Sequence, residues 1–229
     1  MNYATTIGSY RSAGEINQAM GRVYGHMGLA VLTSMIVSYL IGTNAAAMQF
    51  LFGSWLKWVV IFAPLVAVFG VTIALNANPP KPIAMSLLHG FAAIMGLSFS
   101  SIFVVYNFGS IVNAFMGAAV LFGVMSGYGY FTRQSLDSLG KYLFVGLIAI
   151  IIASIINIFL GSSLMQMIIS AVAIVLFMAL TAYDTQKIRE MLMEESTDAA
   201  EVSGALSLYL DFINIFLSLL QLFGGKKDE

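Results

Sequence analysis

The chain has 229 residues and a net charge of -1, and 59% of its residues are hydrophobic while only 9% are charged. Soluble domains carry about 25% charged residues, so this composition, with a mean hydropathy of +0.90, excludes a soluble enzyme and predicts a membrane protein. The charge gives no basic field to attract nucleic acid, and the absence of cysteine with only two histidines excludes disulfides, thiolate chemistry and an all-histidine zinc site.

Seven apolar stretches are long enough to cross a bilayer, because a membrane helix needs about 20 mainly apolar residues. In chain order they lie at roughly 25–43, 55–76, 83–106, 110–131, 141–160, 163–185 and 204–223. Short polar breaks separate most of them. The longest break, at 186–203, predicts that the sixth helix continues past the bilayer before the chain turns back. The sequence therefore predicts an all-α polytopic membrane protein made of one seven-helix bundle.

This pattern divides the chain into three parts. Residues 1–24 are predicted to form a cytoplasmic N-terminal tail, residues 25–224 the seven-helix transmembrane domain and residues 225–229 a short C-terminal tail. Lysine and arginine are enriched in cytoplasmic loops, so their distribution orients the bundle. With the N-terminus inside, the outside segments hold Lys57, Lys226 and Lys227, and the inside segments hold Arg11, Arg22, Lys81, Arg133, Lys141, Lys187 and Arg189. This excess predicts a cytoplasmic N-terminus and an external C-terminus.

Two acidic residues fall within the last two spans or at their edge: Asp184 in "LTAYDTQKIRE" and Asp211 in "ALSLYLDFINIFLSLLQLF". Asp211 lies roughly 10 Å beyond the start of its span, at about 1.5 Å per helical residue, and Asp184 comes just before the charged end of the sixth helix. Because these helices are consecutive and antiparallel, we expect both acids in the cytoplasmic half, facing each other. The charged run "MEESTDAAE", at 193–201 between them, is most simply solvated.

The seventh span also carries a stripe of polar residues. Ser207, Asp211, Asn214, Ser218 and Gln221 follow at steps of 4, 3, 4 and 3, which keeps all five on one helix face. Such a face is costly against lipid, so we expect the seventh helix to be central. Ser207, Asn214 and Ser218 are therefore candidates for lining a pore. Packing is the alternative, because serine and amide side chains in membrane helices often only hydrogen-bond neighbouring helices.

The two acids together predict a pH-sensitive cation gate. An intramembrane acid usually marks an ion or proton pathway, and two close carboxylates do not both ionise easily, so the pair would share a proton. Carboxylate oxygens are hard ligands that suit Ca²⁺. The sequence therefore predicts that Asp184 and Asp211 are the pH sensor and a transient Ca²⁺ site. No resident cofactor is expected, and the expected partners are membrane lipid, Ca²⁺ and protons.

Three segments identify a family resemblance. "GLSFSSIFVVY" at 96–106, "LTAYDTQKI" around Asp184 and "GALSLYLDFINIFLSLLQLFG" around Asp211 resemble the bacterial branch of the Bax inhibitor-1 family. The resemblance covers essentially the whole chain, from "VYGHMGLAV" at 23–31 onwards. It implies seven helices with the seventh surrounded by the other six, and a pH-sensitive Ca²⁺ leak through a di-aspartyl site. It also implies a bacterial cytoplasmic (inner) membrane location.

The chain departs from that pattern at the closing partner. Some family members carry an arginine near the inner end of the second helix that pairs with the sixth-helix acid, whereas this chain has "TIALNANPPKP" there. Lys81 is the nearest basic candidate, but it follows two prolines and lysine lacks the bidentate fork of arginine. Family members are associated with the regulation of cell death and of membrane proteases, and these loops identify no such protein partner.

Two other functions would use the same acids. A proton-coupled secondary transporter needs the same pair, and the sequence barely separates it from a leak. An intramembrane aspartyl protease also places Tyr-Asp on one helix and a second acid on the next. Its Gly-x-Gly-Asp motif is absent here, because Leu208 and Leu210 flank Tyr209. We therefore expect that the protein is not an enzyme.

Overall fold

The computed structural model describes residues 12–194, 197–225 and 227, and every regular element within them is a helix. Seven spans are long and apolar enough to cross a membrane, one of them formed by α4 and α5 together. The predicted class, an all-α polytopic membrane protein, is confirmed. The helices are α1 (Ala13–Gly42), α2 (Ala45–Phe52), α3 (Leu56–Asn76), α4 (Lys81–Phe99), α5 (Ile102–Val105), α6 (Phe108–Phe131), α7 (Asp137–Leu160), α8 (Ser163–Glu194) and α9 (Asp198–Phe223).

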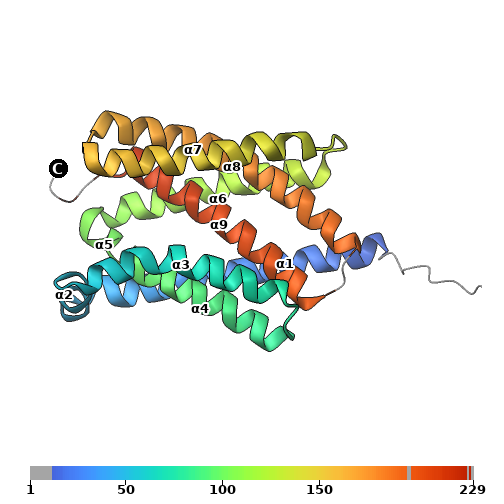
Figure 1. Cartoon of the computed structure of the whole chain (residues 1–229), viewed down its shortest axis with the longest axis horizontal. Helices are drawn as coiled ribbons and strands as arrows, with labels where there is room; N and C mark the ends of the chain where they lie inside the picture. Colours follow the sequence, from blue (N-terminus) through green and yellow to red (C-terminus); the bar gives the residue numbers. More distant parts are fainter. Residues whose placement is uncertain (1–11, 195–196, 226, 228–229) are drawn as a thin grey trace, which may run out of the picture.

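Helix α9 crosses the bundle obliquely, with α7 and α8 on one side and α3 and α4 on the other (Figure 1). It packs against α1, α3, α4, α6 and α8. In its most apolar window 56% of residues are buried, against 11–28% in the other six spans, so α9 is the most buried span. That all six other spans surround it stays a prediction.

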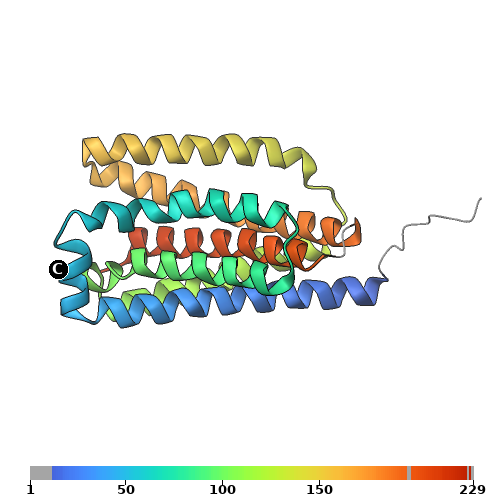
Figure 2. The ribbon, with the colours of Figure 1, turned by 60° about the horizontal axis from the view of Figure 1, so that its bottom comes forward.

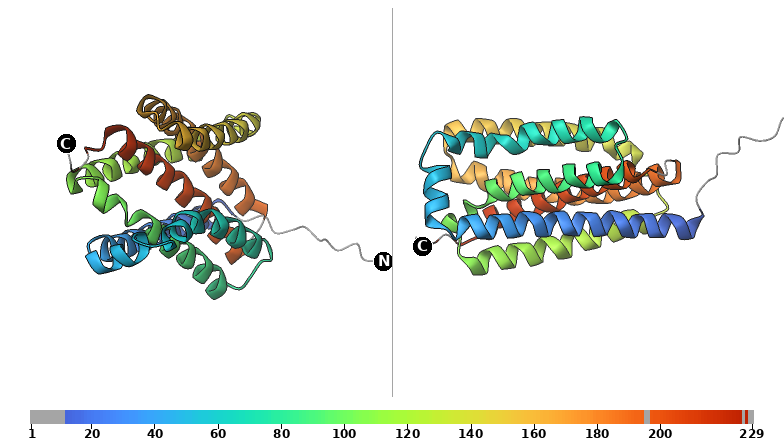
Figure 3. Two further views of the ribbon diagram at one scale, coloured as in Figure 1. Left: turned by 60° about the vertical axis from the view of Figure 1, so that its left-hand side comes forward. Right: turned by 90° about the horizontal axis from the view of Figure 1, so that it is seen from below.

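The bundle has two distinct ends. At one end, which we call the α8 end, α1 begins, α8 ends and α9 begins; it lies at the right in Figure 1. At the other, the α2 end, the short helix α2 lies across the spans (Figures 2 and 3). The last described residues also lie at the α2 end, where the backbone N–H of Lys227 donates to the carbonyl of Val105 at 3.1 Å. The described residues therefore begin and end at opposite ends of the bundle, as an odd number of spans requires.

The first helix begins earlier than the predicted span. Ser12 caps it: the Glu15 N–H donates to Ser12 Oγ at 3.3 Å, and the Ser12 N–H donates to the Glu15 carboxylate at 2.7 Å. This reciprocal capping satisfies N–H groups at the helix start, so residues 13–24 of the predicted tail are helical. Residues 1–11 with Arg11, and residues 226 and 228–229 with Lys226, lie outside the described residues. The membrane boundaries of the three predicted parts stay a prediction.

Two features near the α2 end were not expected from the sequence. Asn44 caps α2 by accepting from the Ala47 N–H at 3.0 Å, so the first loop contains a helix. The predicted third span is interrupted after Phe99, where the hydroxyl of Ser100 donates to the Leu97 carbonyl at 2.6 Å. Serine hydroxyls that bond nearby carbonyls offer the backbone an alternative to the helix. The chain resumes as the four-residue helix α5.

The sixth predicted span continues as a helix to Glu194, as the sequence predicted. The seventh helix begins at Asp198, earlier than expected, because the Thr197 hydroxyl accepts from the Ala200 N–H at 3.1 Å and caps it. Much of the predicted polar break is thus helical, and Asp184 and Asp211 lie in two long helices.

Candidate functional site

Asp184 lies on α8 and Asp211 on α9. The two helices pack extensively against each other. Asp211 is 4% exposed, and its Oδ2 has no hydrogen-bond partner among the described residues. Asp184 is only partly buried. A buried carboxylate oxygen without a partner is costly, so Asp211 is a candidate functional residue.

A cleft of about 390 Å³ reaches Asp184 from the α8 end. The last turns of α8 and the first turns of α9 line it, and Ser207 is the residue of the predicted polar stripe within it. Its acidic side chains outnumber its basic ones. The lining residues are Asp184, Lys187, Ile188, Glu190, Met191, Glu194, Ser203, Gly204 and Ser207.

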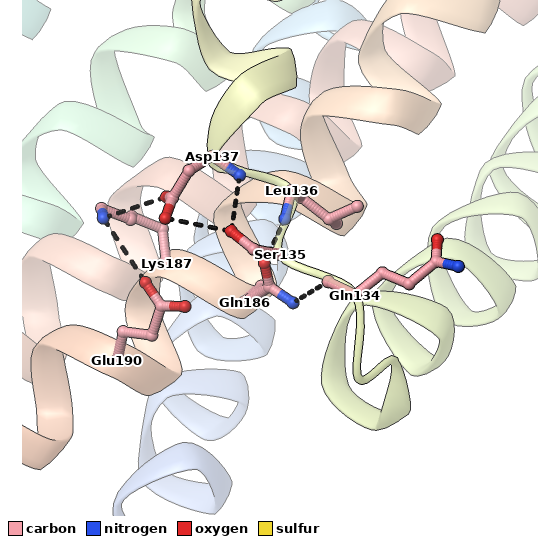
Figure 4. A network of polar contacts seen from close by, with 7 residues as sticks. All are labelled: Gln134, Ser135, Leu136, Asp137, Gln186, Lys187 and Glu190. Carbon is pink, nitrogen blue, oxygen red and sulfur yellow. Dashed lines mark hydrogen bonds and ion pairs between the residues drawn. The ribbon is translucent and has the colours of Figure 1, made fainter.

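The one lysine of this cleft is already paired. Lys187 Nζ lies 3.3 Å from Asp137 Oδ1 and 3.4 Å from Glu190 Oε2 (Figure 4). The neighbouring Gln186 accepts the Leu136 N–H at 2.7 Å and donates to the Gln134 carbonyl at 3.0 Å. These hydrogen bonds hold the loop between α6 and α7 against α8, two residues after Asp184. The positive charge of Lys187 is offset by two carboxylates.

Helix α8 also packs closely against α6, and a chain of hydroxyl groups links it to α6 and α1. Tyr24 Oη lies 2.7 Å from Ser126 Oγ, which lies 3.0 Å from Thr185 Oγ1. Gly129 of α6 packs directly on α8, because a Cβ there would overlap the Ala182 carbonyl oxygen. The turn of α8 that carries Asp184 is thus held by α1 and α6.

An ion pair fixes the start of α9, and the sequence analysis did not predict it. Arg22 of α1 donates to Glu201 from Nε at 2.8 Å and from the terminal nitrogen at 2.6 Å. Glu201 is 3% exposed, so the expectation that the run at 193–201 is solvated is wrong at this residue. The early start of α9 explains the error, because it turns Glu201 into the bundle, where an arginine of another helix stabilises its charge.

Comparison with known proteins shows the family to which the chain belongs. The family model described as inhibitor of apoptosis-promoting Bax1 matches residues 16–228, which include both acids. The chain belongs to the Bax inhibitor-1 family. It is 37% identical over 219 residues to the inner membrane protein YbhL of Escherichia coli, covering 91% of this chain and 92% of that protein.

Two further relatives belong to other bacteria. The uncharacterized protein YrjE of Lactococcus lactis is 37% identical over 239 aligned positions and covers all of both chains. An uncharacterized protein of Borreliella burgdorferi is 36% identical over 219 residues, with 93% of this chain and 94% of that protein covered. The predicted family membership is therefore confirmed over the whole bundle, and membership in this membrane-protein family is what the relatives support.

The other predicted site residues fall in different surroundings. Asn214 donates from Nδ2 to the Leu210 carbonyl of its own helix at 2.8 Å, whereas the packing alternative expects bonds to neighbouring helices. Ser218 is buried and 7% exposed. Gln221 accepts hydrogen bonds from Gln166 at 2.6 Å and Ser170 at 3.1 Å, both on α8. A pore-lining role for Ser207, Asn214 and Ser218 stays a prediction.

Lys81, the predicted closing partner, lies at the start of α4. Its ammonium pairs with Asp198 Oδ1 at 3.5 Å, and both side chains are about half exposed, at 44% and 52%. This contact joins α4 to the first turn of α9 and leaves the lysine engaged away from Asp184.

No group of three or more potential metal-ligating side chains occurs within residues 12–194, 197–225 and 227. Ca²⁺ takes six to eight oxygen ligands, so two carboxylates would leave most of its shell to water and backbone oxygens. A transient Ca²⁺ site at Asp184 and Asp211 stays a prediction.

Proposed function

We propose that this protein is a pH-sensitive leak pathway for Ca²⁺ or a related cation, gated by Asp184 and Asp211. One observation carries the proposal: an acidic cleft reaches Asp184 on α8, and the helix packed against it, α9, carries Asp211, which is buried and has one oxygen without a partner among the described residues. Intramembrane acids of this kind usually mark ion or proton pathways.

The cleft supports entry of a cation rather than an anion. Asp184, Glu190 and Glu194 face it, and its one lysine is offset by two carboxylates. A cleft with low-dielectric walls focuses the field of the charges that line it and raises the local concentration of counter-ions. Ca²⁺, as a divalent ion, gains most from such a field.

The pair would act as the gate because its two carboxylates respond to protons together. With one proton shared, they form a hydrogen bond that joins α8 to α9 and favours the closed state. When that proton leaves, the two like charges repel, which favours separation of the helices. Flux should therefore be low at acidic pH and rise as the pH increases.

The proposal also includes the orientation of the bundle and the membrane in which it lies. The excess of lysine and arginine at the α8 end supports a cytoplasmic N-terminus, so the acidic cleft opens toward the cytoplasm and the α2 end faces outward. The name of the Escherichia coli relative supports a bacterial inner membrane. We expect no enzymatic activity.

Ca²⁺ entry into dye-loaded liposomes tests the proposal. The purified protein is compared with Asp184→Asn and Asp211→Asn over about pH 5 to 8, where a coupled carboxylate pair can titrate. Asp198→Asn is the matched control, because Asp198 is an acid of the same helix α9 that is 52% exposed and pairs with Lys81. We expect pH-dependent flux in the parent and the control, and a flattened profile in the other two variants.

The proposal would be wrong if the Ca²⁺ flux through the parent protein never rises above that of empty liposomes at any pH. It would also be wrong if all three variants show the same pH profile as the parent. Flux that saturates and moves Ca²⁺ against its gradient when a proton gradient is imposed would identify the transporter instead, because a leak runs only downhill.

A further inference from the structure

Helices α1 and α6 run side by side (Figure 3) but form an open seam. Helix α1 packs against α4, α8 and α9, and α6 packs against α8 and α9, whereas the described residues show no extensive packing of α1 on α6. Near the α8 end, two side-chain hydrogen bonds bridge the seam, from Tyr24 to Ser126 at 2.7 Å and from Tyr130 to Asn17. The seam is hollowed beside these bonds, where residues that include Tyr24, Ser126 and Tyr130 line a space of about 460 Å³. A separate groove lies between the two helices toward the α2 end.

This groove has a volume of about 380 Å³ and a wholly apolar accessible wall. Helix α9 forms its floor with Ile213 and Phe216, which are 4% and 7% exposed. Three of the lining residues carry hydroxyls: Ser34, Ser38 and Tyr39. Ser34 Oγ lies 2.6 Å from Tyr209 Oη and 2.8 Å from the Ala92 carbonyl, and Ser38 is only 5% exposed.

The interruption after Phe99 helps to form the hollow. Where α4 would continue beside α1, the chain turns and resumes as α5, and Phe103 packs edge-on against Tyr39 at 5.9 Å between ring centroids. The groove therefore lies between α1, α5 and α6 and opens sideways, where a straight helix would have filled the space.

Water is a poor occupant of this space. A buried water needs two to four polar partners, and cavities lined only by apolar side chains stay dry. Even an apolar cavity of about 150 Å³ takes up a small hydrocarbon in preference to water, and this groove is more than twice as large.

The rim of the groove is continuous with the lipid-facing surface. Met35, Ile36 and Leu40 of α1 line it and are 47%, 54% and 61% exposed, and Phe108 and Met116 of α6 line it and are 63% and 58% exposed. Large exposed apolar side chains on spanning helices contact the bilayer interior. An acyl chain that follows this surface therefore reaches the groove along these apolar side chains.

A helix from a second copy fits less well. A helix is about 10 Å across with a pitch of about 5.4 Å, so less than one full turn would occupy the whole volume. A single flexible acyl chain matches both the volume and the sideways opening. Because lipid tails are as apolar as the wall, the chain would be retained by van der Waals packing rather than by a hydrophobic gain.

We propose that one acyl chain of a membrane phospholipid occupies this groove and packs against Ile213 and Phe216 of α9. The site does not depend on the proposed ion pathway, because it rests only on the shape and chemistry of the seam. If both exist, the lipid touches the helix that carries Asp211, so the composition of the bilayer would act on the gate through α9.

Tryptophan quenching by lipids with brominated acyl chains tests this proposal. The two native tryptophans, Trp55 and Trp58, are replaced by phenylalanine, and Phe216→Trp is introduced as the reporter. Phe177→Trp on α8 is the matched control, because Phe177 is also 7% exposed and does not line the groove. Quenching requires contact with the chain, so we expect it to be about twofold stronger for the reporter than for the control.

A second pair of substitutions shows whether the chain sits in the groove. Val112→Phe fills the groove from α6, while Val120→Phe changes a lipid-facing valine of the same helix away from it. We expect V112F to lower the quenching of the reporter to the level of the control and V120F to leave it unchanged. Ile213→Trp serves as the reporter if F216W does not fold, as judged by circular dichroism.

Equal quenching of F216W and F177W would overturn the proposal, and so would equal effects of V112F and V120F. A groove covered by a second copy would leave the reporter unquenched and give a dimer in native mass spectrometry. That outcome would also overturn the lipid assignment.

Discussion

Helices α7 and α9 show how this bundle sorts its residues. The most apolar window of α7 has a mean hydropathy of 2.9 and only 11% of its residues buried, while that of α9 has 1.7 with 56% buried. In a soluble protein the more apolar helix is expected inside. Here the order is reversed, because lipid solvates apolar side chains at no cost, whereas the polar groups of α9 need protein partners.

The two helices also differ in where their charged and polar side chains lie. In the described part of α7, charged side chains occur only near its start, at Asp137 and Lys141. Helix α9 carries the buried Glu201, which pairs with Arg22, the buried acid Asp211, and Gln221, which accepts hydrogen bonds from α8. Burial among helices, rather than hydropathy, therefore identifies the helix that carries these polar groups. Four substitution experiments test this contrast, from the largest expected effect to the smallest.

Truncating the same residue type on each helix tests the contrast directly. Ile215 of α9 is 0% exposed and Ile152 of α7 is 53% exposed. Ile215→Ala should destabilise the protein by about 2–5 kcal/mol, because it leaves a cavity among packed helices. Ile152→Ala should cost less than about 1 kcal/mol, since lipid refills the space. Thermal unfolding in one detergent measures both, and equal losses would contradict the sorting described here.

Breaking the ion pair at the start of α9 should have the next largest effect. Arg22→Gln leaves Glu201 buried without its arginine, and we expect a loss of about 2–4 kcal/mol, reduced from the cost for a fully buried pair because the Arg22 side chain is 42% exposed. Lys81→Gln breaks only the half-exposed pair with Asp198 and should cost less than about 1 kcal/mol. A smaller melting shift for R22Q than for K81Q would show that Glu201 is solvated.

Adding a methyl group to α6 distinguishes its packed face from its open face. Gly129→Ala places a Cβ against the Ala182 carbonyl, while a Cβ added at Gly127 would have nothing within 4 Å. We expect G129A to destabilise by about 1–3 kcal/mol through overpacking and to shift α8 at the turn that carries Asp184. G127A should be neutral or slightly stabilising in the same thermal unfolding assay.

Removing an amide bond between helices should have the smallest effect. Gln221→Leu removes the acceptor used by Gln166 and Ser170 of α8, and hydrogen bonds between membrane helices contribute about 0.6 kcal/mol on average. The control is Thr72→Val on α3, because the Thr72 hydroxyl bonds only the Val68 carbonyl of its own helix in the described residues. If T72V lowers the melting temperature as much as Q221L, the bonds to α8 are not what stabilises this end.

The sequence predicted features that depend on local composition. The seven spans are confirmed because about 20 apolar residues in a row have few other uses, and the family is confirmed because the segments around Asp184 and Asp211 are distinctive. The helix ends were less well predicted. Ser12 and Thr197 extend α1 and α9 by capping, and hydropathy does not register a cap.

The tertiary structure decided which groups meet. That Glu201 is buried against Arg22, that Lys81 pairs with Asp198, and that a cleft ends at Asp184 all depend on how α1, α4, α8 and α9 are placed. The groove between α1 and α6 depends on the break after Phe99 and on two helices that do not pack together. Hydropathy is a property of each segment, so the sequence alone determined what enters the membrane. Contacts between distant segments are set by packing, which only the assembled bundle defines.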